Sequence, residues 1–464
     1  MGCALVEPPI SDIAIDLEQI RAMAHKEVDK FIDLLAPLLQ KTPAPTLQQM
    51  SAHFMQTRSV LLGGIMKTLS EEVARQYREA THADCPCCGK RVQRMRLDAK
   101  HLSTLQGAFE LERPYFYCKS CQKGFHPMDE ALELAQEVHQ YDMQEKMALF
   151  AAEMPYERAC ELFTQTTGLS PGKHFGHDNL NRIGDLTALE TVIPDQEEIE
   201  RRIEAAKRGS DQPPVLVVAC DGAHAPTRPK AGRNTKRGKG RWREVKGFRL
   251  YLLGEGERII HIAGWHQIKA CELLAKDLEV VAGRIPRDKV RIALLGDGAD
   301  WLWNAMTTCF PEGRSVLDYY HTSEHIAKVA KLQYGDTLAA LQWREATLTR
   351  LFMDKVGHVI GGLRRMDAMS TEAGEEIRKL IGYLDKHSQK FGYQECRDEG
   401  MPIGSGGIES ANKYISHARL KRSGAWWLEE NGNAMLRIRC AIYNGTFDQV
   451  FRRYTELKRR DQPS

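Results

Sequence analysis

Residues 214–220, PVLVVAC, form an apolar, β-branched run of strand length that is followed directly by Asp221. Residues 290–295, VRIALL, repeat this design and are followed, after one glycine, by Asp297. Short apolar runs that end at turn residues predict buried strands. Because neighbouring strands lie about 4.8 Å apart, aspartates that follow two adjacent strands can lie side by side. The repeated design therefore predicts a sheet that brings two carboxylates to one edge.

Three further strands and a helix are predicted next to these two runs in the chain. Residues 247–253 and 258–263 lie on either side of a Gly-Glu-Gly turn and predict the two strands of a hairpin. A helix is predicted for about residues 270–282, and residues 315–319 predict a fifth strand. This order of strands and helices indicates the α/β class.

Two other segments are predicted to be helical. No proline occurs between Pro311 and Pro402, and since proline interrupts helices, its absence over this length indicates a mostly helical interval. Residues 11–80 also carry apolar residues at helical spacing. One face of the proline-free interval is predicted to consist of four apolar residues, Leu338, Leu341, Leu348 and Phe352.

The composition is that of a globular protein. The chain has 464 residues, 42% of them hydrophobic and 27% charged, which excludes a wholly disordered, collagen-like or membrane-spanning chain. The longest apolar runs are far shorter than the roughly 20 residues that cross a bilayer. Most of the twelve cysteines are isolated, which suits a reducing compartment better than a disulfide framework. We therefore expect a cytoplasmic protein of several domains, with no membrane partner.

Four cysteines are spaced as metal ligands. Cys85 with Cys88 and Cys118 with Cys121 form two C-x-x-C pairs with 29 residues between them. Four thiolates in such pairs typically bind one structural Zn²⁺ in a fold too small to bury much core. The separation is longer than the about 15 to 20 residues of the commonest pattern, which a longer β-hairpin can absorb. We predict a zinc ribbon, with four free cysteines as the alternative.

A third acidic residue is expected to join the two strand-end aspartates. Glu409 follows the glycine-rich stretch 404–407 and begins a helix-like run over residues 408–420. Hard carboxylate oxygens suit Mg²⁺, which takes its remaining ligands from water and phosphate groups. The three acids therefore predict phosphoryl-transfer chemistry. The alternative for each Asp-Gly pair is an ordinary turn.

Several motifs in this order resemble one family, the bacterial insertion-sequence DDE transposases of the ISKra group, which are relatives of Mutator-type elements. The resemblance runs from about residue 85 to residue 440. The motifs are CPCCG (85–89), CKSC (118–121), VVACDGAHA (217–225), ALLGDGADWLWN (293–304), SVLDYYH (315–321), GSGGIESANKYI (404–415) and RLKRSGAWW (419–427).

The resemblance implies a ribonuclease-H-like mixed sheet with helices, in which Asp221, Asp297 and Glu409 are the catalytic triad. It implies that these acids hold two Mg²⁺ or Mn²⁺ ions for in-line cutting and joining of DNA at transposon ends. The 112-residue step from the second acid to the third implies an all-helical insertion domain. Asp318 and His321 match a supporting Asp-x-x-His element of the family.

The expected domains follow from the motifs and the helical segments. They are a helical N-terminal region (1–80), the zinc ribbon (81–128), a helical and possible helix-turn-helix DNA-binding region (129–210), the first part of the catalytic core (211–322), the helical insertion domain (323–400), and the second part of the core with C-terminal helices (401–464).

Double-stranded DNA is the expected partner, as transposon terminal repeats and as target. The net charge of +3 is too small to indicate this, but residues 228–249 hold ten Lys or Arg residues and a single acid. A solvated loop is the alternative for this stretch. The predicted DNA contacts are Lys236, Arg237, Lys239, Arg241, Arg243, Arg419, Lys421 and Arg422.

Residues 156–183 have the outline of a helix-turn-helix, with a plain helical hairpin as the alternative. Lys173, His174, His177, Asn179 and Arg182 are the residues that would read bases. Because two DNA ends must be brought together, a homodimer or higher oligomer on DNA is expected. Bound to DNA, the cytoplasmic protein would be associated with the nucleoid.

Two other functions remain open from the sequence. The first is a catalytically silent DNA-binding zinc protein, such as a domesticated transposase. The second is a zinc metalloprotease, because residues 321–325 fit the H-x-x-E-H pattern. In the second case Glu395 or Glu399 would be the third zinc ligand.

Overall fold

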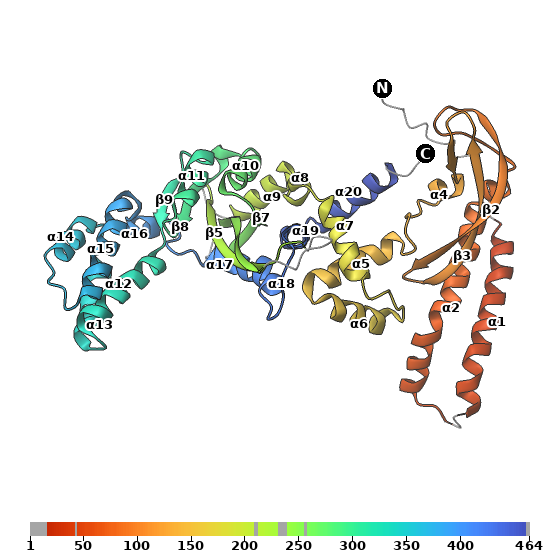
Figure 1. The fold of residues 1–464 in the computed structure, drawn as a ribbon, viewed down its shortest axis with the longest axis horizontal. Helices are drawn as coiled ribbons and strands as arrows, with labels where there is room; N and C mark the ends of the chain where they lie inside the picture. The colour runs from red at the N-terminus through yellow and green to blue at the C-terminus, as the bar shows by residue number, and fades with distance from the viewer. Residues whose placement is uncertain (1–15, 42–43, 208–211, 231–238, 255–257, 461–464) are drawn as a thin grey trace. The chain divides into compact units, whose positions relative to one another are not determined.

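The computed structural model describes residues 16–41, 44–207, 212–230, 239–254 and 258–460 (Figure 1). The fold is a mixed α/β fold and divides into two compact units. The first unit runs up to residue 180 and includes residues 451–464, while the second comprises residues 181–450. No helix in the described ranges is long and apolar enough to span a lipid bilayer. The predicted contacts Lys236 and Arg237 lie outside the described residues.

The first unit begins with two long helices, α1 (Leu17–Lys41) and α2 (Leu47–Val73), which lie side by side (Figure 1). Thr46 caps α2, because its side chain accepts a hydrogen bond from the backbone N–H of Gln49 while the Gln49 side chain bonds back to Thr46. The rings of Phe31 and Phe54 meet edge to face between the helices, with centroids 5.0 Å apart. Helices thus occupy most of the described residues between 17 and 79, in agreement with the apolar spacing of this segment.

An antiparallel sheet follows, with its strands in the order β1-β2-β3-β4. Leu102 and Leu111 on the two long strands are buried with Met128, and a second cluster packs Phe116 against Phe125. These two small cores hold the module together. The strands are β1 (His82–Asp84), β2 (Arg91–Thr104), β3 (Gly107–Cys118) and β4 (Lys123–Phe125).

Helices complete the first unit, and the C-terminal helix is tied to them. The hydroxyl of Tyr454 donates to Oε1 of Gln144 at 2.8 Å, and both residues are buried. The amide of Asn179 donates to the backbone oxygen of Gln144 at 2.6 Å and is fully buried, so its predicted role in reading bases is wrong. The helices are α3 (Arg75–Glu79), α4 (Pro127–Ala131), α5 (Tyr141–Glu153), α6 (Tyr156–Thr167), α7 (Phe175–Asp185) and α20 (Phe447–Arg460).

The second unit is built on a five-stranded sheet in the order β7-β6-β5-β8-β9. In this sheet β5, β6 and β7 pair antiparallel, whereas β8 and β9 run parallel to β5. All five predicted strands are confirmed, with shifted ends. They are β5 (Val215–Thr227), β6 (Arg241–Leu253), β7 (Ile259–Gln267), β8 (Arg291–Gly296) and β9 (Arg314–Leu317).

One of these shifts concerns a predicted site residue. Asp221 does not end its strand, because β5 continues to Thr227 and stays paired with β6. The expected strand end at Asp221, and the alternative of an ordinary turn at this Asp-Gly pair, are both wrong for a physical reason. Ala223 and Ala225 are buried while His224 between them is exposed, which is the alternation of a strand. Only the pairing with β8 stops before Asp221.

Helices bury both faces of this sheet, so that Val215 to Cys220 are all buried. The side chain of Asn444 on α19 accepts from the backbone N–H of Gly264 on β7 at 2.8 Å, which holds this helix against the sheet. The predicted helix over residues 270–282 is confirmed as α10. The elements are α8 (Leu189–Val192), α9 (Gln196–Ala206), α10 (Cys271–Ala282), a 3₁₀ turn (Arg287–Lys289), α11 (Asp300–Cys309) and α19 (Glu429–Asn444).

The proline-free interval is helical, as predicted. The four apolar residues that were predicted to share one helix face differ in their burial. Leu338 and Leu341 are 69% and 55% exposed, whereas Ala340, Thr347, Leu348 and Leu351 on the same helix are buried. Four residues at this spacing also share one helix face. The elements are α12 (Tyr319–Tyr334), α13 (Leu338–Phe352), α14 (Val356–Arg364), α15 (Thr371–Lys386), a 3₁₀ turn (Ser388–Lys390) and α16 (Tyr393–Asp398).

Candidate active site

Asp221 and Asp297 reach the same edge of the second sheet. Strands β5 and β8 pair in parallel as far as Ala219 opposite Leu295. Asp221 lies two residues after Ala219, and Asp297 lies two residues after Leu295. Both aspartates are therefore at the same distance beyond the last pair of β5 and β8. The parallel register therefore brings together two residues that are far apart in sequence.

Asp221 is partly buried and held by two donors. Its Oδ1 accepts from the backbone N–H of Gly222 at 2.7 Å, and its Oδ2 accepts from the side-chain amide of Asn412 at 2.5 Å. Burial, together with the nearby negative charges of Asp297 and Glu409, raises the pKa of Asp221 to about 6. The three predicted acids thus act on one another electrostatically. Their ligand atoms are not all within 4.8 Å of one another, since among the described residues only a cysteine group meets that limit.

Glu409 lies at the surface on a short helix, α17 (Gly406–Ala411), which continues as a π-helical turn (Asn412–His417) and α18 (Ala418–Leu420). Arg249 donates from Nη1 to the backbone oxygen of Gly407 at 2.5 Å. A Cβ atom on Gly407 would lie 2.7 Å from the ring of Tyr251, so this position admits only glycine without a shift of buried atoms. The glycines thus allow the segment before Glu409 to lie close against the sheet.

Asp318 joins the fifth strand to this segment. The carboxylate is 2% exposed and has two backbone donors, the N–H of His321 at 2.8 Å and that of Ser405 at 2.7 Å. The first bond caps α12, and the second fixes the chain four residues before Glu409. The recorded contacts of Asp318 are therefore those of a positioning residue.

The histidines of the H-x-x-E-H pattern contact each other. Nε2 of His321 and Nε2 of His325 lie 3.2 Å apart. The two glutamates that would complete a zinc site instead pair with Arg314, Glu395 at 2.5 Å and Glu399 at 3.4 Å. Within the described ranges these groups form no ligand cluster, so the geometry gives the metalloprotease alternative no support.

Asn412 and Tyr383 are site residues that the sequence did not indicate as such. Asn412 is 3% exposed, and its Oδ1 is buried without a hydrogen-bond partner in the described structure. Its position three residues after Glu409 on one helical segment is a signal that could have identified it. The hydroxyl of Tyr383 on α15 donates to the backbone oxygen of Asp297 at 3.0 Å. No local pattern indicates that contact.

The four predicted cysteines come together in the first unit. The turn between β1 and β2 provides Cys85 and Cys88, and the turn between β3 and β4 provides Cys118 and Cys121. Sγ atoms of Cys85 and Cys121 lie 4.0 Å apart, and those of Cys88 and Cys118 lie 3.7 Å apart. A tetrahedron with zinc–sulfur bonds of about 2.3 Å has edges of about 3.8 Å. The cluster could therefore hold a metal ion such as zinc.

The two basic segments of the second unit meet at one surface. The backbone N–H of Arg228 donates to the oxygen of Trp427 at 2.8 Å, and the N–H of Trp427 donates to the oxygen of Pro226 at 3.1 Å. Two tryptophans are exposed beside this junction, Trp242 by 59% and Trp426 by 43%. The exposed cations are Lys239, Arg241, Lys421 and Arg422.

Two predicted DNA contacts are engaged within the protein. Arg419 is 3% exposed and its guanidinium lies 5.5 Å from the ring centre of Trp427, so it packs inside the unit and is unavailable to DNA. Arg243 pairs with Glu429 at 3.2 Å. The sequence pattern identified the positive charges but not their burial.

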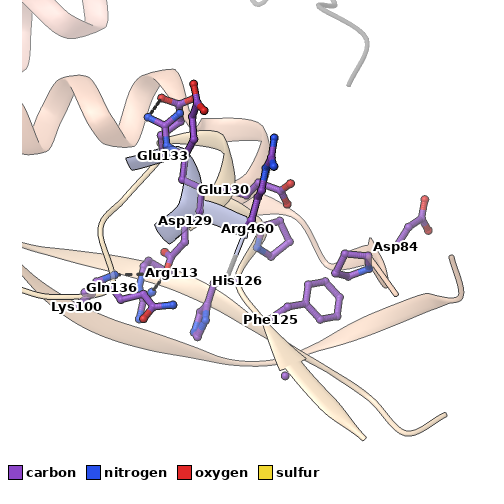
Figure 2. Close-up of a pocket in the computed structure, with 15 residues that line it drawn as sticks. Asp84, Lys100, Arg113, Phe125, His126, Asp129, Glu130, Glu133, Gln136 and Arg460 are labelled. Atoms are coloured by element: carbon purple, nitrogen blue, oxygen red, sulfur yellow. Dashed lines mark hydrogen bonds and ion pairs between the residues drawn. The ribbon is translucent and has the colours of Figure 1, made fainter. Parts of the chain in front are cut away.

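A cavity of about 980 Å³ lies in the first unit (Figure 2). Buried Arg113 pairs with Asp129, and Lys100 lies 3.6 Å from the same carboxylate. Arg459 pairs with Glu133 at 2.5 Å. The lining has four Lys or Arg residues and five acids, so it offers no excess of charge to a charged ligand.

Comparisons with known proteins give relatives without an assigned activity. Two UPF0236 proteins of Caldanaerobacter subterraneus subsp. tengcongensis are 24% identical to this chain over 443 residues, covering 90% of it and 82% or 77% of the relative. A third is 26% identical over 377 residues, 75% of this chain and 70% of the relative.

Among solved structures, the Drosophila P element transposase strand transfer complex aligns with 67% of this chain and 79% of its own, at 10% identity. Its TM-score of 0.23 does not establish a common fold. The family comparison is decisive in contrast, because the family matches residues 45–459. The chain belongs to the uncharacterised protein family UPF0236.

Proposed function

We propose that this protein is a DDE transposase of the ISKra type, which cuts and joins DNA at transposon ends. The observation that carries the proposal is the convergence of Asp221, Asp297 and Glu409, whose charges interact although the residues come from a strand, a strand end and a helix. A carboxyl group with a shifted pKa, such as that of Asp221, beside acids from other elements is typical of functional sites.

The sheet supports the same proposal. In this proposal the antiparallel meander of three strands, joined at its first strand by two parallel strands, forms the ribonuclease-H-like core that the resemblance implies. In this proposal the helices over residues 323–400 are the insertion domain between the second and third acids. The cysteine module over residues 81–128 is a zinc ribbon, and residues 129–210 contribute to DNA binding.

The donor set fits divalent magnesium or manganese. Each carboxylate oxygen of Asp221 accepts one hydrogen bond and keeps a further lone pair. Oxygen ligands of this kind are those that Mg²⁺ takes from proteins. Two such ions, when bound, supply the activation of the attacking hydroxyl and the stabilisation of the leaving oxygen.

The chain's own residues orient the acids. Asn412 and Gly222 hold the Asp221 carboxylate, and Asp318 with Arg249 fixes the loop before Glu409. Burial raises the pKa of Asp221 most, and the charges of Asp297 and Glu409 add to this effect. A bound cation would offset this repulsion between the acids. Exposed lysines and arginines around Trp242 and Trp426 would bind the phosphate backbone of DNA, and a homodimer would bring two ends together.

The test uses DNA from either end of the element that encodes the chain. Ala variants of Asp221, Asp297 and Glu409 should each lose Mg²⁺-dependent strand cleavage and joining while keeping DNA affinity. Asp300→Ala is the matched control, because Asp300 lies three residues from Asp297 and pairs with Lys386 at the surface. Cleavage retained in all three variants would refute the proposal. A wild-type protein that binds these ends with no cleavage would instead support the catalytically silent alternative.

A further inference from the structure

A cleft of about 1390 Å³ opens beside Glu409 in the second unit. We propose that it binds an unpaired stretch of the DNA strand that enters the active site. This inference rests on the proposed function, because Glu409 lines the cleft. The strand would therefore run from the cleft towards the three acids.

The walls of the cleft are rich in aromatic rings. The lining includes Tyr251 from the sheet, Tyr319 and Tyr320 from the start of α12, and Phe352 from the end of α13. The rings of Tyr319 and Phe352 meet edge to face with centroids 6.4 Å apart. Aromatic side chains in a groove are the surfaces on which unstacked bases pack, whatever the base.

Tyr320 is the ring best placed to receive a base. It is 66% exposed, and a Cβ atom on Gly404 would lie 2.5 Å from its Cε2. The ring thus rests on backbone at Gly404 while most of its surface faces solvent. The backbone N–H of the preceding Tyr319 donates to the oxygen of Ile403 at 2.8 Å, which fixes the start of α12 against the same loop.

The charge of the lining suits a phosphate backbone. It contains two arginines, Arg291 and Arg397, and a single acid, Glu409. Arg291 donates to the backbone oxygens of Pro213 at 3.1 Å and Glu399 at 2.8 Å, and these contacts orient its guanidinium without neutralising its charge. Arg397 is exposed. Phosphate groups pair with cations of this kind independently of sequence.

The size and position favour a strand segment over a free mononucleotide. Clefts for drug-sized ligands span about 300–1,000 Å³, so a volume of about 1390 Å³ accommodates more than one nucleotide. Base faces are accessible to aromatic rings only after unstacking, so a paired duplex would leave these rings unused. Because Glu409 lines the cleft, a strand bound there reaches the residue that is proposed to act on it.

The experiment measures binding of a fluorescently labelled ten-nucleotide oligothymidine and of a fully paired duplex to the full-length protein, without added magnesium. Tyr320→Leu should weaken single-strand binding about tenfold and leave duplex binding within about twofold. Tyr320→Phe should keep single-strand binding, since the ring remains. Leu338→Ala is the matched control, because Leu338 is equally exposed and outside the cleft.

A photo-crosslink from a 5-iodouracil base in the oligonucleotide should map to Tyr319 or Tyr320. The proposal is overturned if Tyr320→Leu and Arg397→Ala both bind the oligonucleotide as the wild type does. It is also overturned if thymidine monophosphate displaces the oligonucleotide when the two are present at equal concentrations. That result would indicate a mononucleotide site. This experiment measures binding and no cleavage. If the Ala variants of the three acids kept cleavage, the proposed function would be refuted, and the binding result would be unaffected.

Discussion

The side-chain amide of Asn412 lies 2.5 Å from Oδ2 of Asp221, and this hydrogen bond joins the helical segment of Glu409 to strand β5. The helical segment that carries Glu409 therefore also holds the carboxylate of Asp221 in place. The bond lowers the pKa of Asp221, against the effects of burial and of the neighbouring acids that raise it. Asn412 therefore favours the ionised form that binds a cation.

We expect Asn412→Ala to raise the Mg²⁺ concentration needed for half-maximal cleavage by about tenfold, because a hydrogen bond to a charged group contributes about 1.5–3 kcal/mol. DNA affinity should stay unchanged. Ser410→Ala, an exposed neighbour on the same segment, is the control. An unaltered magnesium titration in the Asn412 variant would show that the bond does not act on the site.

Asp318→Ala should lower the free energy of unfolding by about 2 kcal/mol, since it removes a helix cap and a second buried hydrogen bond. It should also expose the chain near Ser405 to proteolysis, because the bond to that backbone N–H is lost. Urea denaturation and limited proteolysis measure the two effects. Asp336→Ala, at an 86% exposed carboxylate, should change neither. If limited proteolysis gave the same fragments for both variants, the positioning role of Asp318 would be contradicted.

The purified protein should contain one zinc ion per chain, measured by elemental analysis. Cys88→Ser should lose that zinc and lower the melting temperature, because a tetrahedral site needs its fourth thiolate. Cys87→Ser provides a matched control, as Cys87 is the exposed neighbour outside the four-cysteine group. Zinc lost to the same extent from both variants would mean that the cluster is not the site.

Stability should fall as the pH drops from about 6.5 towards 3. Burial lowers the pKa of His261 and of His266 to about 3, so below the ordinary value the unfolded chain binds protons that the folded chain excludes. The stabilisation is complete above about pH 6.5. Below that pH, each histidine adds up to about 1.4 kcal/mol per pH unit to the slope of the free energy of unfolding against pH.

Urea denaturation at several pH values measures this slope. His261→Gln should reduce it, whereas His358→Gln, at an exposed position on α14, should leave it as in the wild type. A wild-type stability that stays constant between pH 6.5 and 4 would contradict the expected burial of neutral imidazoles.

Arg241 is exposed whereas Arg419 is buried, so the two arginines should affect DNA binding differently. Arg241→Ala should weaken DNA binding and lower the slope of log K against log salt by about 1, as expected for one lost phosphate contact. Arg419→Ala should reduce thermal stability and leave the salt slope unchanged, because the side chain is 3% exposed beside Trp427. A reduced salt slope in the Arg419 variant would show that it reaches DNA.

Local pattern was sufficient to predict most strands and helices of the second unit. The apolar run before Asp221 and the spacing of residues 290–295 are properties of a few consecutive side chains, and so is the absence of proline in the helical interval. The same locality explains the errors. A helical spacing of leucines does not say which face is buried. Of the residues predicted to share one face of α13, Leu338 and Leu341 are exposed whereas Leu348 is buried.

The sequence by itself determined which residue types are available: three acids after strand-like or glycine-rich segments, two cysteine pairs, and a run of cations. The tertiary structure decided which of them meet. Asn412 contacts an acid 191 residues away, and Asp318 holds Ser405 across 87 residues. Such contacts depend on strand order and packing, since spacing along a chain carries no information on distance once the chain has folded back on itself.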